Sequence, residues 1–301
     1  MRVDLHQHLW TPPLLDALAV RDELPFVRRA DGLTILYSVA EQPYVIVEES
    51  PEARAGQLAQ DGIDVALIAL SSPIGIETLP RDDASELIHS HLDGVTALPE
   101  QFAAWGPVPL EQPDPADIDT VLARGCRGLS LPATALAGPD ALHAAGPLLE
   151  RAAERGVPVF IHPGGAPPHA HTEASLSEPL WWRALTDYVA QMQAAWLTFA
   201  TLGRRAHPDL TVVFAMLAGN APLLAERLHT RGGPPIELRD PLTFYDTSSY
   251  GPVAVDVLAQ LVGAEQLVYG SDRPILDPLP TGREALLAEN GARLVNQPAP
   301  V

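Results

Sequence analysis

Three histidines and one aspartate in this chain have the types and positions to bind a divalent cation. MRVDLHQHLW places His6 and His8 two residues apart in a strand-like run. Residues two apart on a strand face the same side, with Cα atoms roughly 7 Å apart, so both imidazoles can reach one ion. His162 ends VPVFIHPGG, and Asp272 follows the strand-like LVYGS. Such a set suits Zn²⁺ and other divalent transition ions, which lower the pKa of bound water.

Each of these residues also has a simpler explanation. An H-x-H pair alone is a weak signal, because surface and core histidines are common. His162 could be a structural hydrogen-bonding residue, and Asp272 could cap the helix that follows it. The metal interpretation becomes stronger because all four residues lie at the ends of predicted strands, and such ends can meet at one rim of a barrel.

Apolar runs that alternate with amphipathic stretches must position these residues. The runs predict eight strands: Arg2–His8, Asp64–Leu70, Ala104–Pro109, Gly128–Leu131, Pro158–His162, Thr211–Met216, Phe244–Ser248 and Leu267–Ser271. Helical patterns separate them, and no G-x-G-x-x-G follows any strand. The count of eight favours an α/β fold of the (β/α)8 TIM-like barrel type over an open doubly wound sheet.

One segment interrupts the alternation. Residues 9–50 contain LTILYSV and YVIVEES, which predict a small β-hairpin inserted between strands 1 and 2, over the barrel mouth. Neither a repeat nor a linker divides the chain, so residues 1–301 are predicted to form a single metal-dependent hydrolase barrel domain. Trp181 and Trp182 open a helical pattern that runs to Ala206, and we expect them to pack against the barrel.

Composition limits the partners. Nineteen Lys and Arg residues against 38 Asp and Glu residues give a net charge of −19. An acidic surface repels nucleic-acid backbones and anionic membranes, so neither is expected as a partner. Cys126 is the single cysteine, no signal-peptide pattern opens the sequence, and no apolar run approaches roughly 18 residues. We expect a cytoplasmic protein without an intrachain disulfide.

These motifs together resemble the amidohydrolase superfamily, specifically its amidohydrolase-2 branch. That branch includes aminocarboxymuconate-semialdehyde decarboxylase, resorcylate-type decarboxylases and several lactonases. DLHQHLW is similar to the strand-one H-x-H motif, FIHPG to the strand-five histidine, and LVYGSDRP to the strand-eight G-S-D-x-P. The resemblance covers essentially the whole chain. It implies a distorted barrel that holds one divalent ion through His6, His8, His162 and Asp272. The ligand types favour Zn²⁺, with Mn²⁺ as the alternative.

One position departs from the pattern of that family. Its members usually carry a histidine at the end of strand six, where this chain has Met216 in FAMLAGNAP. Methionine cannot exchange a proton, and its thioether is only a weak acceptor. We expect Met216 to form a wall of the substrate pocket, with ligation of a soft metal as the alternative. Asp272 then becomes the leading candidate for the general base.

Further candidates lie near the predicted rim. His169 and His171, in PGGAPPHAHTEAS, could serve as acid or base or could be solvated loop residues. Other residues that follow predicted strands are candidates for substrate contacts: Trp10, Ser248, Tyr250 and Arg273. Arg273 could equally pair with a barrel carboxylate, and the hydroxyl groups could cap a loop.

Three functions are compatible with this pattern, each with a small molecule as partner. The first is a metal-dependent hydrolase that attacks an ester, lactone or amide with a metal-activated water, Asp272 acting as base. The alternative is a nonoxidative decarboxylase of a small unsaturated or aromatic acid. The third is a non-hydrolytic or ligand-binding barrel, because Met216 replaces the expected histidine. The apolar surfaces of the late helices would permit a homodimer.

Overall fold

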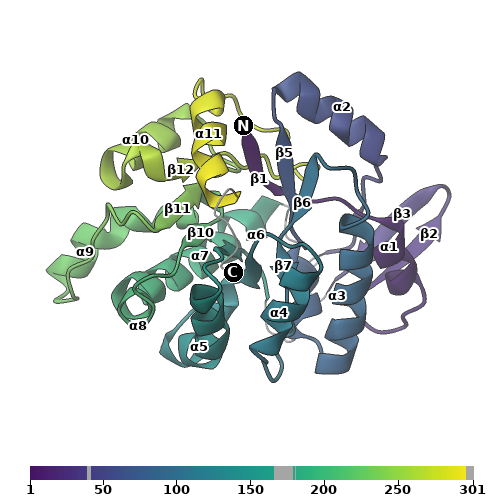
Figure 1. The fold of residues 1–301 in the computed structure, drawn as a ribbon, viewed down its shortest axis with the longest axis horizontal. Helices are drawn as coiled ribbons and strands as arrows, with labels where there is room; N and C mark the ends of the chain where they lie inside the picture. The colour runs from purple at the N-terminus through teal and green to yellow at the C-terminus, as the bar shows by residue number, and fades with distance from the viewer. Residues whose placement is uncertain (39–41, 166–178, 180, 296–301) are drawn as a thin grey trace.

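Parallel strands alternate with helices along the chain, and the helices surround the strands (Figure 1). The computed structural model describes residues 1–38, 42–165, 179 and 181–295. The parallel strands are β1 (Val3–Gln7), β5 (Val65–Ile68), β6 (Phe102–Ala104), β7 (Gly106–Pro107), β8 (Leu129–Pro132), β9 (Val159–His162), β10 (Val212–Phe214), β11 (Thr243–Asp246) and β12 (Leu267–Val268). The helices are α1 (Pro12–Ala19), α2 (Pro51–Asp61), α3 (Arg81–Val95), α4 (Ala116–Ala123), α5 (Pro139–Glu154), α6 (Trp181–Leu185), α7 (Asp187–Thr198), α8 (Arg204–Ala206), α9 (Ala225–Thr230), α10 (Pro252–Val262) and α11 (Glu284–Val295).

The parallel strands form two sheets whose members neighbour one another in chain order. One sheet has the order β1-β5-β6, and the other runs from β7 through β8, β9, β10 and β11 to β12. The two sheets adjoin on both sides. Only Trp105 separates β6 from β7 along the chain, and Leu5 of β1 donates to the Tyr269 carbonyl, next to β12, at 2.9 Å. The predicted α/β class with barrel-type strand order is confirmed.

The strands are buried because side chains fill the space inside them and helices cover the outside. All four residues of β9 are buried, and β9 pairs in register with β8 and β10. Inside, the rings of Trp105 and Phe160 stack with centroids 5.2 Å apart, and the Trp105 indole N–H donates to the Leu5 carbonyl at 2.8 Å. The Phe160 ring contacts that of His6 at 5.1 Å, so an aromatic layer supports the candidate site.

Strand six is shorter than predicted. It ends at Phe214, and the chain from Met216 to Asn220 then has φ between 50° and 61° at five successive residues. Left-handed backbone costs roughly 1–2 kcal/mol for each residue other than glycine, so tertiary contacts must hold this turn. Gln193 of α7 donates to the Gly219 carbonyl at 2.9 Å. A strand pattern alone does not reveal such a turn.

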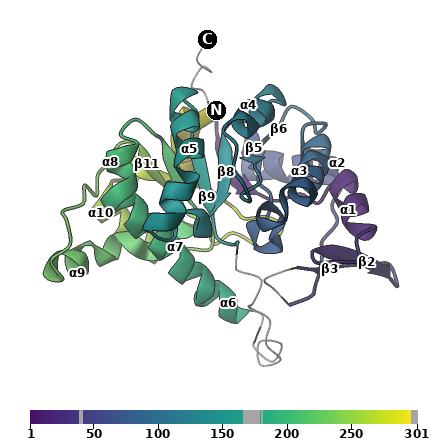
Figure 2. The same ribbon diagram turned by 90° about the horizontal axis from the view of Figure 1, so that it is seen from below.

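The inserted segment is larger than the predicted hairpin. It contains α1 and a three-stranded antiparallel sheet in the order β2 (Phe26–Ala30), β3 (Leu33–Tyr37) and β4 (Tyr44–Val45). β3 and β4 match the predicted hairpin, whereas β2 lacks a clear apolar alternation because its sequence is FVRRA. Figure 2 shows the β2–β3 hairpin at the same end of the molecule as α6, away from the N-terminus.

The helix predicted from Trp181 to Ala206 is interrupted. α6 ends at Leu185, α7 starts after Thr186, and a π-helical turn spans Phe199–Gly203. The break at Thr186 lets α6 extend away from the barrel (Figure 2). Trp181 and Trp182 are consequently 56% and 43% exposed, and the expectation that they pack against the barrel is wrong.

Candidate metal centre

The three predicted histidines and Asp272 meet at the carboxyl ends of their strands. The Nε2 atoms of His6 and His8 are 3.2 Å apart, and Asp272 Oδ1 lies 3.4 Å and 3.2 Å from them. One ligand atom of His162 joins them, all within 4.8 Å of one another. Ligands about 2.1 Å from a tetrahedral ion are about 3.4 Å apart, so this buried cluster has the spacing to hold a metal ion.

Each imidazole of the cluster is oriented by an acceptor on its other ring nitrogen. These acceptors lie 2.7–2.9 Å from Nδ1: Asp246 Oδ2 for His6, the Ala69 carbonyl for His8 and the Pro163 carbonyl for His162. Carboxylate and carbonyl oxygens can only accept, so they place a proton on each Nδ1 and direct each Nε2 inward. Three inward nitrogens and a carboxylate fit a cation, because each offers a lone pair and all four converge on one point.

Asp246 is a site residue that the sequence analysis missed. It is fully buried at the end of β11, and its Oδ1 accepts the backbone N–H groups of Ser248 at 2.7 Å and Met216 at 3.3 Å. The Asp246 carboxylate therefore connects the chain after β10 and the chain after β11 to His6. Asp246 lies inside the predicted strand Phe244–Ser248, whereas β11 (Thr243–Asp246) ends at this residue, so the apolar pattern did not place it at a strand end.

Backbone bonds to strand one hold Asp272 beside the histidines. Asp272 has φ 57°, in the left-handed region that aspartate tolerates better than most residues, and its N–H donates to the His6 carbonyl at 2.8 Å. The carbonyl of Arg273 accepts the His8 N–H at 2.7 Å. The main chain thus sets where the Asp272 carboxylate lies relative to both imidazoles.

Burial and charge act in opposite directions on the pKa of His6 and in the same direction on that of His162. Burial lowers the pKa of His6, but the charges of Asp246 and Asp272 and the hydrogen bond to Asp246 outweigh it and raise this pKa to about 9. Burial, with the charges of His6 and His8, holds the pKa of His162 well below its ordinary value. In the absence of a cation, His6 therefore keeps a second proton at neutral pH and His162 does not.

Cation binding is expected to release about one proton per chain at pH 7.5, because His6 must lose its second proton to ligate. Apparent affinity should rise with pH, by up to about tenfold per unit, and level off above the His6 pKa of about 9. Calorimetric titration with Zn²⁺ in buffers of different ionisation enthalpy measures the proton count. Release of the same number of protons at pH 7.5 and at pH 10 would contradict a doubly protonated His6 in the metal-free protein.

The structure places the predicted substrate-contact residues unevenly around this cluster. Met216 is buried, and its backbone N–H donates to Asp246 Oδ1. The hydroxyl oxygen of buried Ser248 has no hydrogen-bond partner within the described residues. The Tyr250 hydroxyl accepts the Asn220 side-chain N–H at 2.9 Å.

The remaining predicted contacts are Trp10, Arg273, His169 and His171. Trp10 is buried at the start of the insert, with its ring 6.5 Å from that of Tyr44. Arg273 pairs with Asp61 at 3.5 Å and Asp277 at 3.3 Å, which favours the carboxylate-pairing alternative for this residue. His169 and His171 lie outside the described residues.

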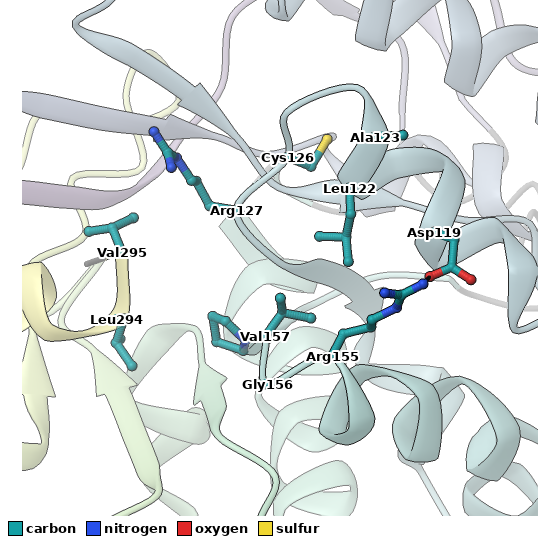
Figure 3. Close-up of a pocket in the computed structure, with 11 residues that line it drawn as sticks. Asp119, Leu122, Ala123, Cys126, Arg127, Arg155, Gly156, Val157, Leu294 and Val295 are labelled. Atoms are coloured by element: carbon teal, nitrogen blue, oxygen red, sulfur yellow. Dashed lines mark ion pairs between the residues drawn. The ribbon is translucent and has the colours of Figure 1, made fainter. Parts of the chain in front are cut away.

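A cavity of about 360 Å³ lies at the opposite ends of the strands (Figure 3). Its lining includes residues that precede β8 and β9, among them Cys126, Arg127 and Pro158. Burial raises the pKa of the Cys126 thiol to about 12, so it stays protonated. Arg155 is paired with Asp119 there. Function gathers at the carboxyl ends of barrel strands, and this cavity is at the other face.

A parallel α/β barrel with imidazoles and a carboxylate at the carboxyl ends of its strands has the architecture of a barrel enzyme. The chain belongs to the amidohydrolase family, in its amidohydrolase-2 branch: the model of that family matches residues 3–294. The predicted family is confirmed, and with it an enzyme of the amidohydrolase superfamily. A search of curated protein sequences finds no significant match.

Solved structures of similar fold include several decarboxylases. The apo form of IDCase from Metarhizium anisopliae is 20% identical with a TM-score of 0.74, covering 99% of this chain and 92% of that one. 2,6-Dihydroxybenzoate decarboxylase from Rhizobium is 15% identical with a TM-score of 0.69, covering 98% of each chain. The D314N mutant of 5-carboxyvanillate decarboxylase from Novosphingobium aromaticivorans, with bound manganese and a nitrobenzoic acid, is 16% identical with a TM-score of 0.68, covering 100% and 92%. At these identities the likeness shows the fold.

Proposed function

We propose that this protein is a metal-dependent nonoxidative decarboxylase of a small aromatic or unsaturated acid. The observation that carries the proposal is the placement of Asp272 in the cluster. Its side chain is 14% exposed, against 1–3% for His6 and His8, so a substrate that reaches the cluster meets this carboxyl group. The decarboxylases among proteins of similar fold, one of them with manganese, support the same reaction class.

The four side chains of the cluster would hold one divalent ion, Zn²⁺ by ligand type or Mn²⁺ by likeness to the manganese-bound structure. Such an ion supplies positive charge that binds and polarises anionic oxygens of the substrate. Asp272 would take a proton from solvent and deliver it from its carboxyl oxygen to the carbon that bears the substrate carboxylate. The carbon–carbon bond then breaks, CO₂ leaves, and the bonding electrons restore the π system. Asp272 recovers its proton from solvent.

Hydrolysis of an ester, lactone or amide is the second candidate. The same Asp272 oxygen, 3.2–3.4 Å from two imidazole nitrogens, is placed to accept a proton from an attacking water. Asp272 has opposite roles in the two reactions: it donates a proton in decarboxylation and accepts a proton in hydrolysis. Product analysis therefore separates them.

Product analysis of metal-loaded protein tests this proposal. Chain reconstituted with Zn²⁺ or Mn²⁺ is incubated with hydroxybenzoates, unsaturated acids, lactones and amides, while CO₂ and organic products are measured in parallel. We expect one CO₂ per acid consumed, loss of activity with a chelator, and recovery on adding the ion. Lactone or amide cleavage without CO₂ would instead establish the second candidate.

Met216→His is expected to raise the catalytic efficiency on one of these substrate classes about tenfold or more. The new imidazole would stand two residues after the end of β10 and can exchange a proton that the thioether cannot. The measurement is kcat/KM on the same panel. Met216→Leu, which keeps an apolar side chain, serves as the control and should stay near wild type. Equal behaviour of both variants would show that position 216 is only a wall.

Partner, assembly and location remain predictions for a small-molecule substrate, a homodimer and the cytoplasm. Within the part of the chain that the structure describes, no helix has the length and apolar character to cross a bilayer. Oligomeric state is measured directly by light scattering on the metal-loaded protein.

A further inference from the structure

Arg54 places a buried guanidinium directly behind the metal-binding strand. It lies on α2, and its side chain is 1% exposed. Nη1 donates to Gln7 Oε1 at 2.9 Å and to the His8 carbonyl at 3.3 Å, while Nη2 pairs with the Glu49 carboxylate. A buried cation is costly unless its donors are satisfied, so these contacts hold each other in one geometry.

Gln7 extends this contact to a second ligand-bearing segment. Its Nε2 donates to Asp4 Oδ2 at 2.8 Å. Asp4 Oδ1 in turn accepts the backbone N–H of His6 and that of Ser271, each at 3.1 Å. Ser271 immediately precedes Asp272. The resulting chain of hydrogen bonds reaches the backbone at or next to three of the four candidate ligands.

We propose that Arg54 is a positioning residue for the metal centre, acting through Gln7 and Asp4. The guanidinium holds the His8 carbonyl, and the Gln7–Asp4 pair holds the main chain of both segments on which ligands lie. Partners that orient ligands in this way commonly change metal affinity 10- to 100-fold when removed. The inference rests on the proposed metal centre and names a residue that sets its geometry.

The Glu49 contact adds a link to the inserted segment. Glu49 belongs to residues 9–50, and its carboxylate pairs with Nη2, whereas Gln7 accepts from Nη1. One side chain therefore joins the end of the insert to the strand of His6 and His8. The competing explanation is that Arg54 merely packs α2 against the barrel.

Two variants on the same helix separate these explanations. Arg54→Met removes the guanidinium and keeps a long apolar side chain, whereas Leu58→Ala shortens another fully buried residue of α2 that has no polar atoms. Three quantities are measured for each: the Zn²⁺ dissociation constant by competition with a chromophoric chelator, the visible spectrum of the Co²⁺ form, and urea unfolding of the metal-free chain.

We expect Arg54→Met to bind Zn²⁺ at least tenfold more weakly and to shift the Co²⁺ absorption bands. Leu58→Ala should lose stability and keep the affinity and spectrum of the wild type. Equal affinity and spectrum in both variants would overturn the proposal. Should Arg54→Met fail to fold, Arg54→Lys provides the test, since lysine keeps the charge but cannot form the same fork. Its expected result is a several-fold weaker affinity, and wild-type affinity would overturn the proposal.

Failure of the metal centre itself would look different. A wild-type chain that binds neither Zn²⁺ nor Co²⁺ overturns the proposed function and the positioning role together. A wild type that binds the ion, beside an Arg54 variant that binds it equally well, overturns the positioning role alone. Both results come from the same titrations.

Discussion

Asp272→Asn is expected to lower turnover by about 10³-fold, because its amide cannot exchange the proton that either candidate reaction requires. The amide oxygen can still face the cluster, and the backbone bond from residue 272 to the His6 carbonyl does not depend on the side chain. The variant should therefore keep more bound metal than His162→Ala, which removes an imidazole outright. Steady-state kcat and metal content are measured on the same preparations.

A nearby carboxylate provides the control for this substitution. Asp277 lies five residues further on, its side chain is fully exposed, and it pairs with Arg273 at 3.3 Å. Asp277→Asn changes the charge of the same loop by the same amount and should leave kcat within about twofold, because an exposed pair contributes little. Wild-type turnover in Asp272→Asn would refute the proposed role of Asp272.

Asp246→Asn is expected to weaken metal binding by about 10- to 100-fold, although Asp246 does not belong to the ligand cluster. Its Oδ1 accepts hydrogen bonds from the backbone N–H groups of Ser248 and Met216. In the variant, the amide oxygen of asparagine should occupy this position, because the amide nitrogen cannot accept them. The amide nitrogen then faces His6 Nδ1, where Oδ2 accepted a hydrogen bond at 2.7 Å. An N–H donor there favours the tautomer that carries its proton on Nε2, which is the nitrogen needed for ligation.

Metal competition assays at pH 9.5 measure this effect best, because His6 with its pKa of about 9 then holds little excess proton in the wild type. Ser248→Ala is the matched control. It keeps the backbone N–H on Asp246 and removes only a hydroxyl group that has no partner within the described residues. Its metal affinity should equal that of the wild type. Unchanged affinity in Asp246→Asn would mean that Asp246 does not set the His6 tautomer.

The barrel-type fold and the cluster could be predicted because both depend on local patterns. Eight apolar runs marked the positions of the parallel strands, the third of which is divided into β6 and β7, and the side-chain alternation of a strand placed His6 and His8 on one face. The position of His162 and Asp272 at strand ends then implied that parallel strands would bring them to the same rim. No long-range information beyond the order of the strands was needed.

The supporting contacts could not be predicted in the same way. Asp246, Arg54 and the Ala69 carbonyl reach the ligands through pairings between segments far apart in the chain. A carbonyl has no signature in the sequence at all. The left-handed turn after β10 is likewise stabilised by a contact from α7, so the sequence of the turn itself does not predict its conformation.

The inserted segment and α6 show the limits of periodicity. β2 was missed because FVRRA does not alternate, and its pairing with β3 over five residues determines its structure. Trp181 and Trp182 suggested burial by their size, yet the break at Thr186 sets their direction and leaves both exposed. Tertiary context overrides residue type in both cases.

The central claim is that His6, His8, His162 and Asp272 bind one divalent cation. Its most direct test is the metal stoichiometry, by mass spectrometry, of chain equilibrated with Zn²⁺ or Mn²⁺ and then freed of unbound ion. The account predicts one ion per wild-type chain and none in folded His6→Ala/His8→Ala, with folding checked by circular dichroism. A wild type that retains neither ion, or a double variant that retains one as tightly, would contradict it.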